Sequence, residues 1–259
     1  MRRTLASLVL LFAPFVSPAA QSLGERVAAS DGLIQVVFPS RPGVCGDGQS
    51  TIGNLLGRSN YYGGGDVQFN GHGSWSDRPC VHGPARVVAT VIGREVTRLR
   101  TYVGPVPATS TDTRTITASA SDASAWLGDI ATRGTGRVAS DAILPLVIAD
   151  APQPWPLLLR VARDDSRPRE VRRSALTWLA NGVNDHLGIA DTRDNTEDDE
   201  MRTQAVFVLS QRPKAESVPE LIELSRSSKH ASVRRSAIFW LGQTGDPRAV
   251  DVFAELLGQ

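Results

Sequence analysis

Three nine-residue stretches in the last hundred residues share one pattern: VRRSALTWL at 171–179, MRTQAVFVL at 201–209 and VRRSAIFWL at 233–241. Each begins with an aliphatic side chain followed by arginine, and each has alanine at the fifth position, a branched residue at the sixth and leucine at the ninth. Their first residues lie 30 and 32 positions apart. Recurrence at a nearly fixed period of this size is typical of stacked supersecondary units. The stretches therefore predict a repeat protein.

Short amphipathic segments accompany these stretches. Residues 155–162 precede the first stretch, residues 218–225 precede the third, and residues 248–257 follow it. Each unit is therefore predicted to be a pair of helices. The middle unit departs from this pattern, because residues 182–195 replace its first helix and lead into the acidic run 191–200. Continuous stacking is not predicted there.

The stretches resemble HEAT-like repeats of the phycobilisome-lyase type. In that family the second helix of each unit carries this spacing of aliphatic residue, arginine, alanine and leucine, and the turn often reads Gly-Asp-Pro, as residues 245–247 do here. The resemblance covers residues 154–257. It implies an armadillo-type α-solenoid that binds proteins, and it says little about activity. The half of the chain before residue 154 resembles no family that we can name.

Helical geometry assigns faces to the repeated stretches. At 100° per residue, with Val171 at zero, a buried stripe contains Ala175, Leu176, Trp178 and Leu179. Arg172 falls inside that stripe, and burial of an unpaired charge is prohibitive. We therefore expect a structural ladder of arginines paired with carboxylates or carbonyls, although the side chains could instead extend to solvent. The ladder consists of Arg172, Arg202 and Arg234, and Trp178 and Trp240 are predicted to be core.

Other side chains of the stretches point away from the stripe and form the predicted binding surface. Aromatic and arginine side chains on an open helical face are typical of hot spots at protein interfaces. The alternative is that the two phenylalanines pack beneath a neighbouring part of the chain. The predicted surface consists of Arg173, Thr177, Thr203, Phe207, Arg235 and Phe239.

The chain before the repeats has a different composition. Residues 21–103 are rich in glycine and β-branched residues, with a strand predicted at 33–38 and a hairpin of 85–91 and 95–103 that turns near Gly93. Residues 104–118 are rich in threonine and read as a linker. Residues 119–259 are predicted to be helical, beginning with segments 119–132 and 140–150. The expected fold class is α+β, a small β-rich N-terminal module followed by an all-α HEAT-like helical-hairpin solenoid.

Residues 1–20 read as a secretory signal peptide. Arg2 and Arg3 precede the apolar run 5–16, and the small residues 17–20 follow it. A run of about a dozen residues is short for a membrane-spanning helix, which needs roughly 20. We expect cleavage near Ala19 or Ala20, a periplasmic or extracellular location, and no membrane insertion after cleavage.

The expected export of the protein affects the predicted chemistry of its two cysteines. In an oxidising compartment, Cys45 and Cys80 are predicted to form a disulfide, which would also staple the glycine-rich segment 43–83. Two alternatives remain open. A zinc site could combine both thiolates with His72 and His82. A nucleophilic dyad could pair Cys80 with one of those histidines.

Charge and motifs narrow the function further. Lysine and arginine total 28 against 27 acidic residues, a formal net charge of +1, so a nucleic-acid partner is not expected. The sequence contains no G-x-S-x-G, H-E-x-x-H or phosphate-binding loop. The acidic run 191–200 could bind Ca²⁺, but a solvated helix start is the simpler interpretation.

These observations predict an exported, non-enzymatic scaffold that binds a protein or peptide partner through its helical repeats, with no catalytic residue, metal or cofactor. Two alternatives remain. The protein could be an accessory subunit or a hydrolase with a site in the glycine-rich module. It could also be the regulatory module of an envelope signalling or proteolytic system.

Overall fold

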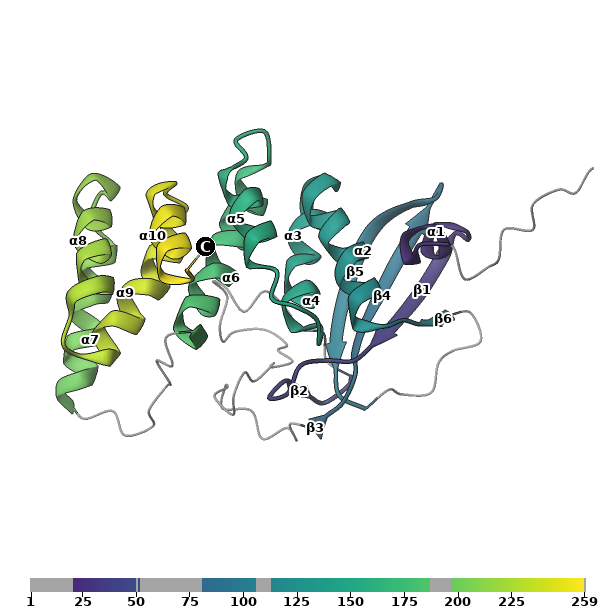
Figure 1. The fold of residues 1–259 in the computed structure, drawn as a ribbon, viewed down its shortest axis with the longest axis horizontal. Helices are drawn as coiled ribbons and strands as arrows, with labels where there is room; N and C mark the ends of the chain where they lie inside the picture. Colours follow the sequence, from purple (N-terminus) through teal and green to yellow (C-terminus); the bar gives the residue numbers. More distant parts are fainter. Residues whose placement is uncertain (1–20, 50, 52–80, 106–112, 187–196, 259) are drawn as a thin grey trace, which may run out of the picture.

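The computed structural model describes residues 21–49, 51, 81–105, 113–186 and 197–258. A four-stranded sheet lies at one end of the molecule (Figure 1). Its strand order is β5–β4–β1–β6, with β1 antiparallel to β4, β4 antiparallel to β5, and β6 parallel to β1. These strands are β1 (Gly32–Phe38), β4 (Ala85–Ile92), β5 (Glu95–Val103) and β6 (Thr113–Thr117); a separate short ladder pairs β2 (Cys45–Gly46) with β3 (Val81–His82).

The hairpin of β4 and β5 follows from its turn. Gly93 and Arg94 both have positive φ, at 58° and 69°. A two-residue turn of this kind matches the right-handed twist of the flanking strands. The amide of Arg94 also donates to Oδ1 of Asp31 at 3.2 Å. The strand and the hairpin predicted from the sequence are confirmed.

Strand β6 lies inside the segment predicted to be a linker, 104–118. That part of the prediction is wrong, because residues 113–117 pair with β1. Only Ile116 of β6 is buried, while Arg114, Thr115 and Thr117 are exposed. An edge strand with a single buried apolar residue shows no hydrophobic alternation, so the sequence gives no strand signal.

A layer of helices covers one face of the sheet. Helices α2 (Ala120–Arg133), α4 (Ile143–Ile148) and α3 (Gly136–Asp141) contact β1, β4 and β5 respectively. The short helix α1 (Leu23–Ala28) packs on α2, and a capping box between Ser22 and Glu25 begins it. The segment predicted as one helix, 140–150, is divided between α3 and α4.

Six further helices contain the repeated stretches. The three stretches lie in α6 (Arg169–His186), α7 (Glu197–Ser210) and α9 (Ala231–Thr244). The accompanying segments form α5 (Trp155–Arg163), α8 (Lys214–Ser227) and α10 (Arg248–Leu256). A β-rich region followed by a run of helices confirms the predicted α+β class.

The helices are not stacked in the order of the chain. Helix α9 packs against both α6 and α7, and α10 packs against α5, α6 and α8. The pair α9–α10 therefore lies between α5–α6 and α7–α8, and the C-terminus lies in the middle of the helical part (Figure 1). Ion pairs on both sides of α10 hold it there: Asp251 pairs with Arg163 of α5 at 3.0 Å, and Glu255 pairs with Arg226 of α8.

Helices α6 and α9 pack closely and run in opposite directions. A Cβ placed on Gly242 would lie 2.8 Å from Cβ of Ala180, and one on Gly245 would lie 3.8 Å from Cγ of Arg173. Residues nearer the C-terminal end of α9 thus lie beside residues nearer the N-terminal end of α6. Ala180 and Gly242 both follow the ninth-position leucine of their stretches, so equivalent positions meet and the packing is locally two-fold. In a sequential solenoid, the equivalent helices would run parallel.

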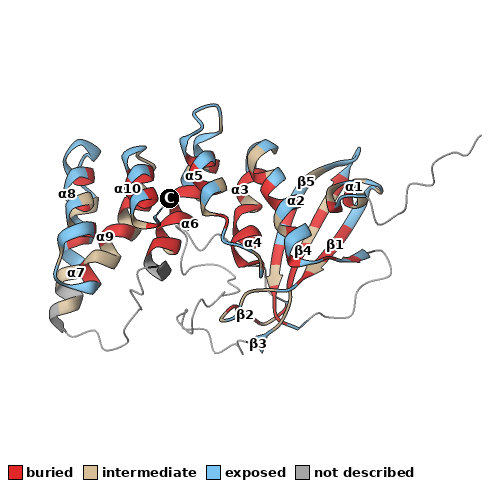
Figure 2. Ribbon diagram, viewed as in Figure 1, coloured by how far each residue is buried: buried red, intermediate tan, exposed pale blue. Residues whose placement is uncertain are grey.

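The core is continuous from the sheet to the last helix. One cluster of buried apolar side chains extends from Leu23 to Leu257 (Figure 2). Leu179 and Leu241 are fully buried, and Leu209 is partly buried against the cluster. Within the described part of the chain, no helix has the length and apolar character needed to cross a membrane.

Candidate interaction surface

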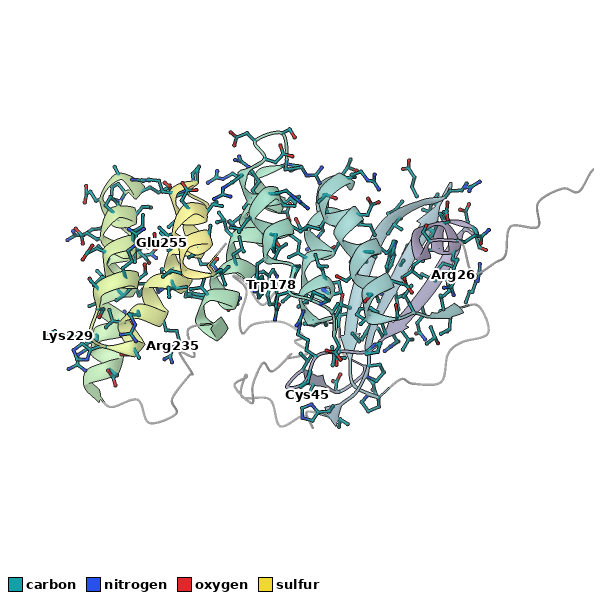
Figure 3. All side chains as sticks on the ribbon, viewed as in Figure 1. Arg26, Cys45, Trp178, Lys229, Arg235 and Glu255 are labelled. Carbon is teal, nitrogen blue, oxygen red and sulfur yellow. The ribbon has the colours of Figure 1, made fainter. Side chains whose placement is uncertain are left out.

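Helices α6, α9 and α7 form one long side of the repeat, and α5, α10 and α8 form the opposite side. Figure 3 shows Arg235 projecting from α9 on the first side, with Glu255 of α10 on the other. Arg173 and Phe207 of the predicted surface are exposed, and Thr203, Arg235 and Phe239 are partly buried. These five residues therefore lie on the three helices of the first side.

Three aromatic side chains of α7 and α9 form a cluster on this side. The ring of Trp240 lies 5.1 Å from that of Phe207 and 5.0 Å from that of Phe239, the latter pair edge-to-face. Aromatic pairs in such orientations contribute about 1 kcal/mol beyond their buried area. Phe207 retains 36% of its surface. The cluster therefore joins α7 to α9 and leaves Phe207 partly exposed.

Thr177 does not belong to this surface. Its exposure is 1%, and its Oγ1 donates to the backbone oxygen of Arg173 at 2.8 Å. The sequence prediction was wrong here because it assumed that α6 packs on one side only. Helix α9 covers a second side of α6, and a Cβ on Gly242 would lie 3.5 Å from Cα of Thr177. Trp178 is buried as expected, whereas Trp240 is only partly buried.

A groove of about 490 Å³ opens between α7, α8 and α9. Its apolar lining includes Val208, which is 57% exposed, together with Leu209 and Leu224. Its charged lining is Arg202, Arg212 and Glu220, with His230 beside them. Apolar walls with a few polar groups at the rim are the usual construction of a binding groove.

The sequence did not identify this groove. Ala205 to Leu209 are five consecutive apolar residues. In an ordinary amphipathic helix, such a run would cover more than the buried stripe. Val206 is buried and Val208 is exposed, so α7 presents apolar side chains in two directions. This run of apolar residues was the sequence signal from which the groove could have been predicted.

The three arginines of the predicted ladder each lie beside an oxygen atom. Nη1 of Arg172 donates to Asp165 at 2.5 Å, and Nη1 of Arg202 donates to Asp199 at 3.1 Å. Nη1 of Arg234 donates to the carbonyl of Ser228 at 2.7 Å. All three side chains are partly exposed. Arg172 and Arg234 join the starts of α6 and α9 to the turns before them, whereas Arg202 pairs with a residue of its own helix. The structural role of the ladder stays a prediction.

Comparison with protein families locates this groove within a known repeat. Residues 189–259 match the family model for HEAT repeats. The match covers α7 to α10, and we refer to this stretch as the HEAT region. The resemblance predicted from the sequence is therefore confirmed for the second and third stretches. Comparison with the curated proteins and with the solved structures found no match.

Candidate sites outside the HEAT region are only partly described. Cys45 is buried in β2, but Cys80 and His72 lie outside the described residues, so the disulfide stays a prediction. Residues 191–196 of the acidic run also lie outside them. Among the residues that the structure does describe, no cluster of three or more histidine, cysteine, aspartate or glutamate side chains could hold a metal ion.

A cavity of about 780 Å³ at the end of β1 includes Ser40, His82 and Asp150. Ser40 donates its Oγ proton to the carbonyl of Gly83 at 2.7 Å, and Nδ1 of His82 lies 3.1 Å from the carbonyl of Val44. A nucleophile and its base must lie within hydrogen-bond reach of each other. The observed hydrogen bonds direct both groups to the backbone.

Arg86 is a buried charge that sequence reasoning missed. Its Nη1 donates to Oε1 of Gln35 at 3.1 Å, its Nη2 donates to the carbonyl of Gly48 at 2.5 Å, and its guanidinium lies 4.3 Å from the ring centre of Tyr102. Burial lowers the pKa of Arg86. The guanidinium therefore joins β1, β4 and β5 to the segment that contains Gly48.

Proposed function

We propose that this protein is an exported, non-enzymatic scaffold that binds a protein or peptide partner through the groove of α7, α8 and α9. The observation that carries the proposal is the exposure of Val208 and Phe207 beside that groove. Large apolar side chains left in water beside a concave site are typical of protein interfaces. The match of the HEAT region to a repeat family associated with protein interaction supports the same conclusion.

The charges of the groove favour a partner segment with acidic groups. Among the described lining residues, Arg202 and Arg212 stand against Glu220, and Arg202 also pairs with Asp199 at 3.1 Å, so Arg212 carries the positive charge that a partner meets. Complementary charge at the rim contributes mainly to the association rate and to selectivity, while the apolar contacts provide most of the affinity. An amphipathic segment with acidic flanks meets both requirements.

Export is part of the same proposal. It is supported by the charged, apolar and small-residue regions of residues 1–20. Cleavage after Ala19 or Ala20 leaves every described element intact, because α1 begins at Leu23. Mass spectrometry of the protein recovered from the periplasm or medium should give an N-terminus at Ala20 or Gln21. Recovery of the full chain from the cytoplasm would refute export.

Site-specific crosslinking in intact cells tests the groove. A photoreactive residue in place of Val208 should give a discrete protein adduct. The matched control replaces Arg133 of α2, whose side chain is 77% exposed but lies outside the HEAT region. Adducts of equal yield at both positions, or none at position 208, would show that the groove is not the binding site.

The double variant Phe207→Ala with Phe239→Ala distinguishes contact from packing. If the aromatic cluster meets the partner, the variant should lose the adduct at position 208 while its melting temperature falls only by a few degrees. If the two phenylalanine rings only pack within the protein, the melting temperature should fall and the adduct at position 208 should persist in the folded fraction.

A further inference from the structure

Strand β5 forms an open edge of the sheet. It is nine residues long, and among the described residues β4 is its only neighbour in the sheet. No described residue outside β4 makes a backbone hydrogen bond to residues 95–102. Long edge strands present a row of unpaired N–H and C=O groups to which another chain can pair. At the other edge, β6 has only five residues.

A groove runs beside this open edge. It has a volume of about 240 Å³ and lies between β5, helix α3 and the start of α4. Leu99 and Thr101 form its floor and are both 4% exposed, while Val138 and Leu144 form its wall. An extended chain laid along β5 would therefore place one set of alternate side chains over Leu99, Val138 and Leu144, with the polar side chains of Thr51 and Thr101 beside them.

The opposite set of side chains of β5 carries positive charge. Arg98 and Arg100 alternate with the buried residues and are exposed. Successive residues of a strand point to opposite faces, so these side chains leave β5 on the face away from α3, and both arginines also contribute to the lining of the groove. Arg137 of α3 adds a third guanidinium at the rim, where Asp141 is the single carboxylate.

These charges also decide which occupant suits the edge. Pairing β5 with β5 of a second copy would place the arginines of both chains on the same face within reach of each other, and like charges on neighbouring strands are destabilising. A strand with acidic side chains at alternate positions instead places its carboxylates beside Arg98 and Arg100. The edge is thus closed to self-association and open to an acidic strand.

We propose that an extended peptide segment with alternating acidic and apolar side chains adds to the edge of β5 as a fifth strand. The acidic side chains lie along Arg98 and Arg100, and the apolar side chains lie in the groove against Val138 and Leu144. Main-chain hydrogen bonds supply affinity in strand addition, and the alternate side chains supply specificity. This site is separate from the groove of the HEAT region.

Fluorescence anisotropy with the full mature chain tests the proposal. The probe is a labelled hexapeptide of alternating glutamate and valine, and the first control alternates lysine with valine. The acidic peptide should bind with saturation, and the basic peptide should bind at least about tenfold more weakly. Equal binding of the two peptides would overturn the proposal.

Backbone methylation distinguishes strand addition from simple charge attraction. Two versions of the acidic peptide carry N-methyl groups on alternate amides, in opposite phase. Only one edge of the peptide faces β5, so one version should lose binding and the other should retain it. Equal affinity of the two versions would show that no strand is added.

Protein variants complete the test. Arg98→Glu with Arg100→Glu should weaken the acidic peptide about tenfold and strengthen the basic one. Both side chains are exposed, so the fold should persist, which circular dichroism checks. Arg133→Glu reverses an exposed charge on α2, outside both candidate sites, and should leave peptide affinity unchanged. If the arginine variant binds both peptides as the natural chain does, the site lies elsewhere.

Discussion

Gly242→Ala perturbs the contact between α6 and α9. The new methyl group would lie 2.8 Å from Cβ of Ala180 and 3.3 Å from the carbonyl oxygen of Leu176. Neither neighbour can move aside, since one is a side chain without rotamers and the other is backbone. The helices must therefore separate by several tenths of an ångström over a buried interface.

The expected loss follows from two opposing effects. Overpacking of a well-packed interior costs about 1–3 kcal/mol. Replacement of glycine by alanine within a helix gains about 1 kcal/mol in propensity. The net effect of Gly242→Ala is a loss of about 1 kcal/mol in the free energy of unfolding. A domain of this size should then melt about 2–4 °C lower.

A second substitution makes the test sharp. Ala180→Gly, added to Gly242→Ala, removes the methyl group that the new one meets, so stability should return close to the natural value although the helix has gained a glycine. The matched control adds Ala125→Gly, at an exposed position of α2, which should lower stability by a further ~1 kcal/mol. Urea denaturation measures all four proteins. If Gly242→Ala is stabilising, or if Ala180→Gly fails to restore it, α6 and α9 do not pack here.

Three further substitutions test other parts of the fold. Trp178→Ala should lower the free energy of unfolding by about 3–5 kcal/mol, as measured by calorimetry, because the side chain of Trp178 is 2% exposed. Asp246 accepts hydrogen bonds from the side chain and amide of Arg248, which lower the pKa of Asp246 below 3.8. Asp246→Ala should therefore lower the free energy of unfolding by about 1 kcal/mol at pH 7. This loss should vanish as the pH falls through the lowered pKa. Burial raises the pKa of Asp141 above 3.8, so Asp141→Asn should increase stability at pH 7, and urea titrations should show this gain shrinking as the pH falls towards 3.8. An Asp246 penalty independent of pH, or an Asp141 gain that grows in acid, would contradict these assignments.

The helices and the hairpin could be predicted because their signals are local. The repeated apolar pattern predicts α6, α7 and α9, and the turn at Gly93 marks the hairpin, whereas α1 lies unpredicted within the β-rich module. The order of stacking could not be predicted, because α6, α7 and α9 carry nearly the same buried pattern and any of them could pack on any other. The error at Thr177 has the same origin, since its burial depends on which helix is the neighbour.

The candidate surface was predicted in part. Phe207 and Arg235 lie on the expected side, since their helix faces follow from spacing alone. Val208 was missed because an apolar residue next to a buried one reads as core, and only the position of α7 at the outer end of the repeat leaves it exposed. Strand β6 was missed because its pairing with β1 involves residues about 80 positions apart.

The position of α9 and α10 between the other two helix pairs affects how the chain can assemble. A conventional solenoid can grow from one end, with each new unit settling on the last as it is synthesised. Here α6 must wait for α9 and α10, which are synthesised after α7 and α8, and until then the apolar faces of α6, α7 and α8 remain uncovered. A chain that stops short of residue 231 therefore lacks the two helices that cover α6, α7 and α8. We expect proteases to degrade such a truncated chain.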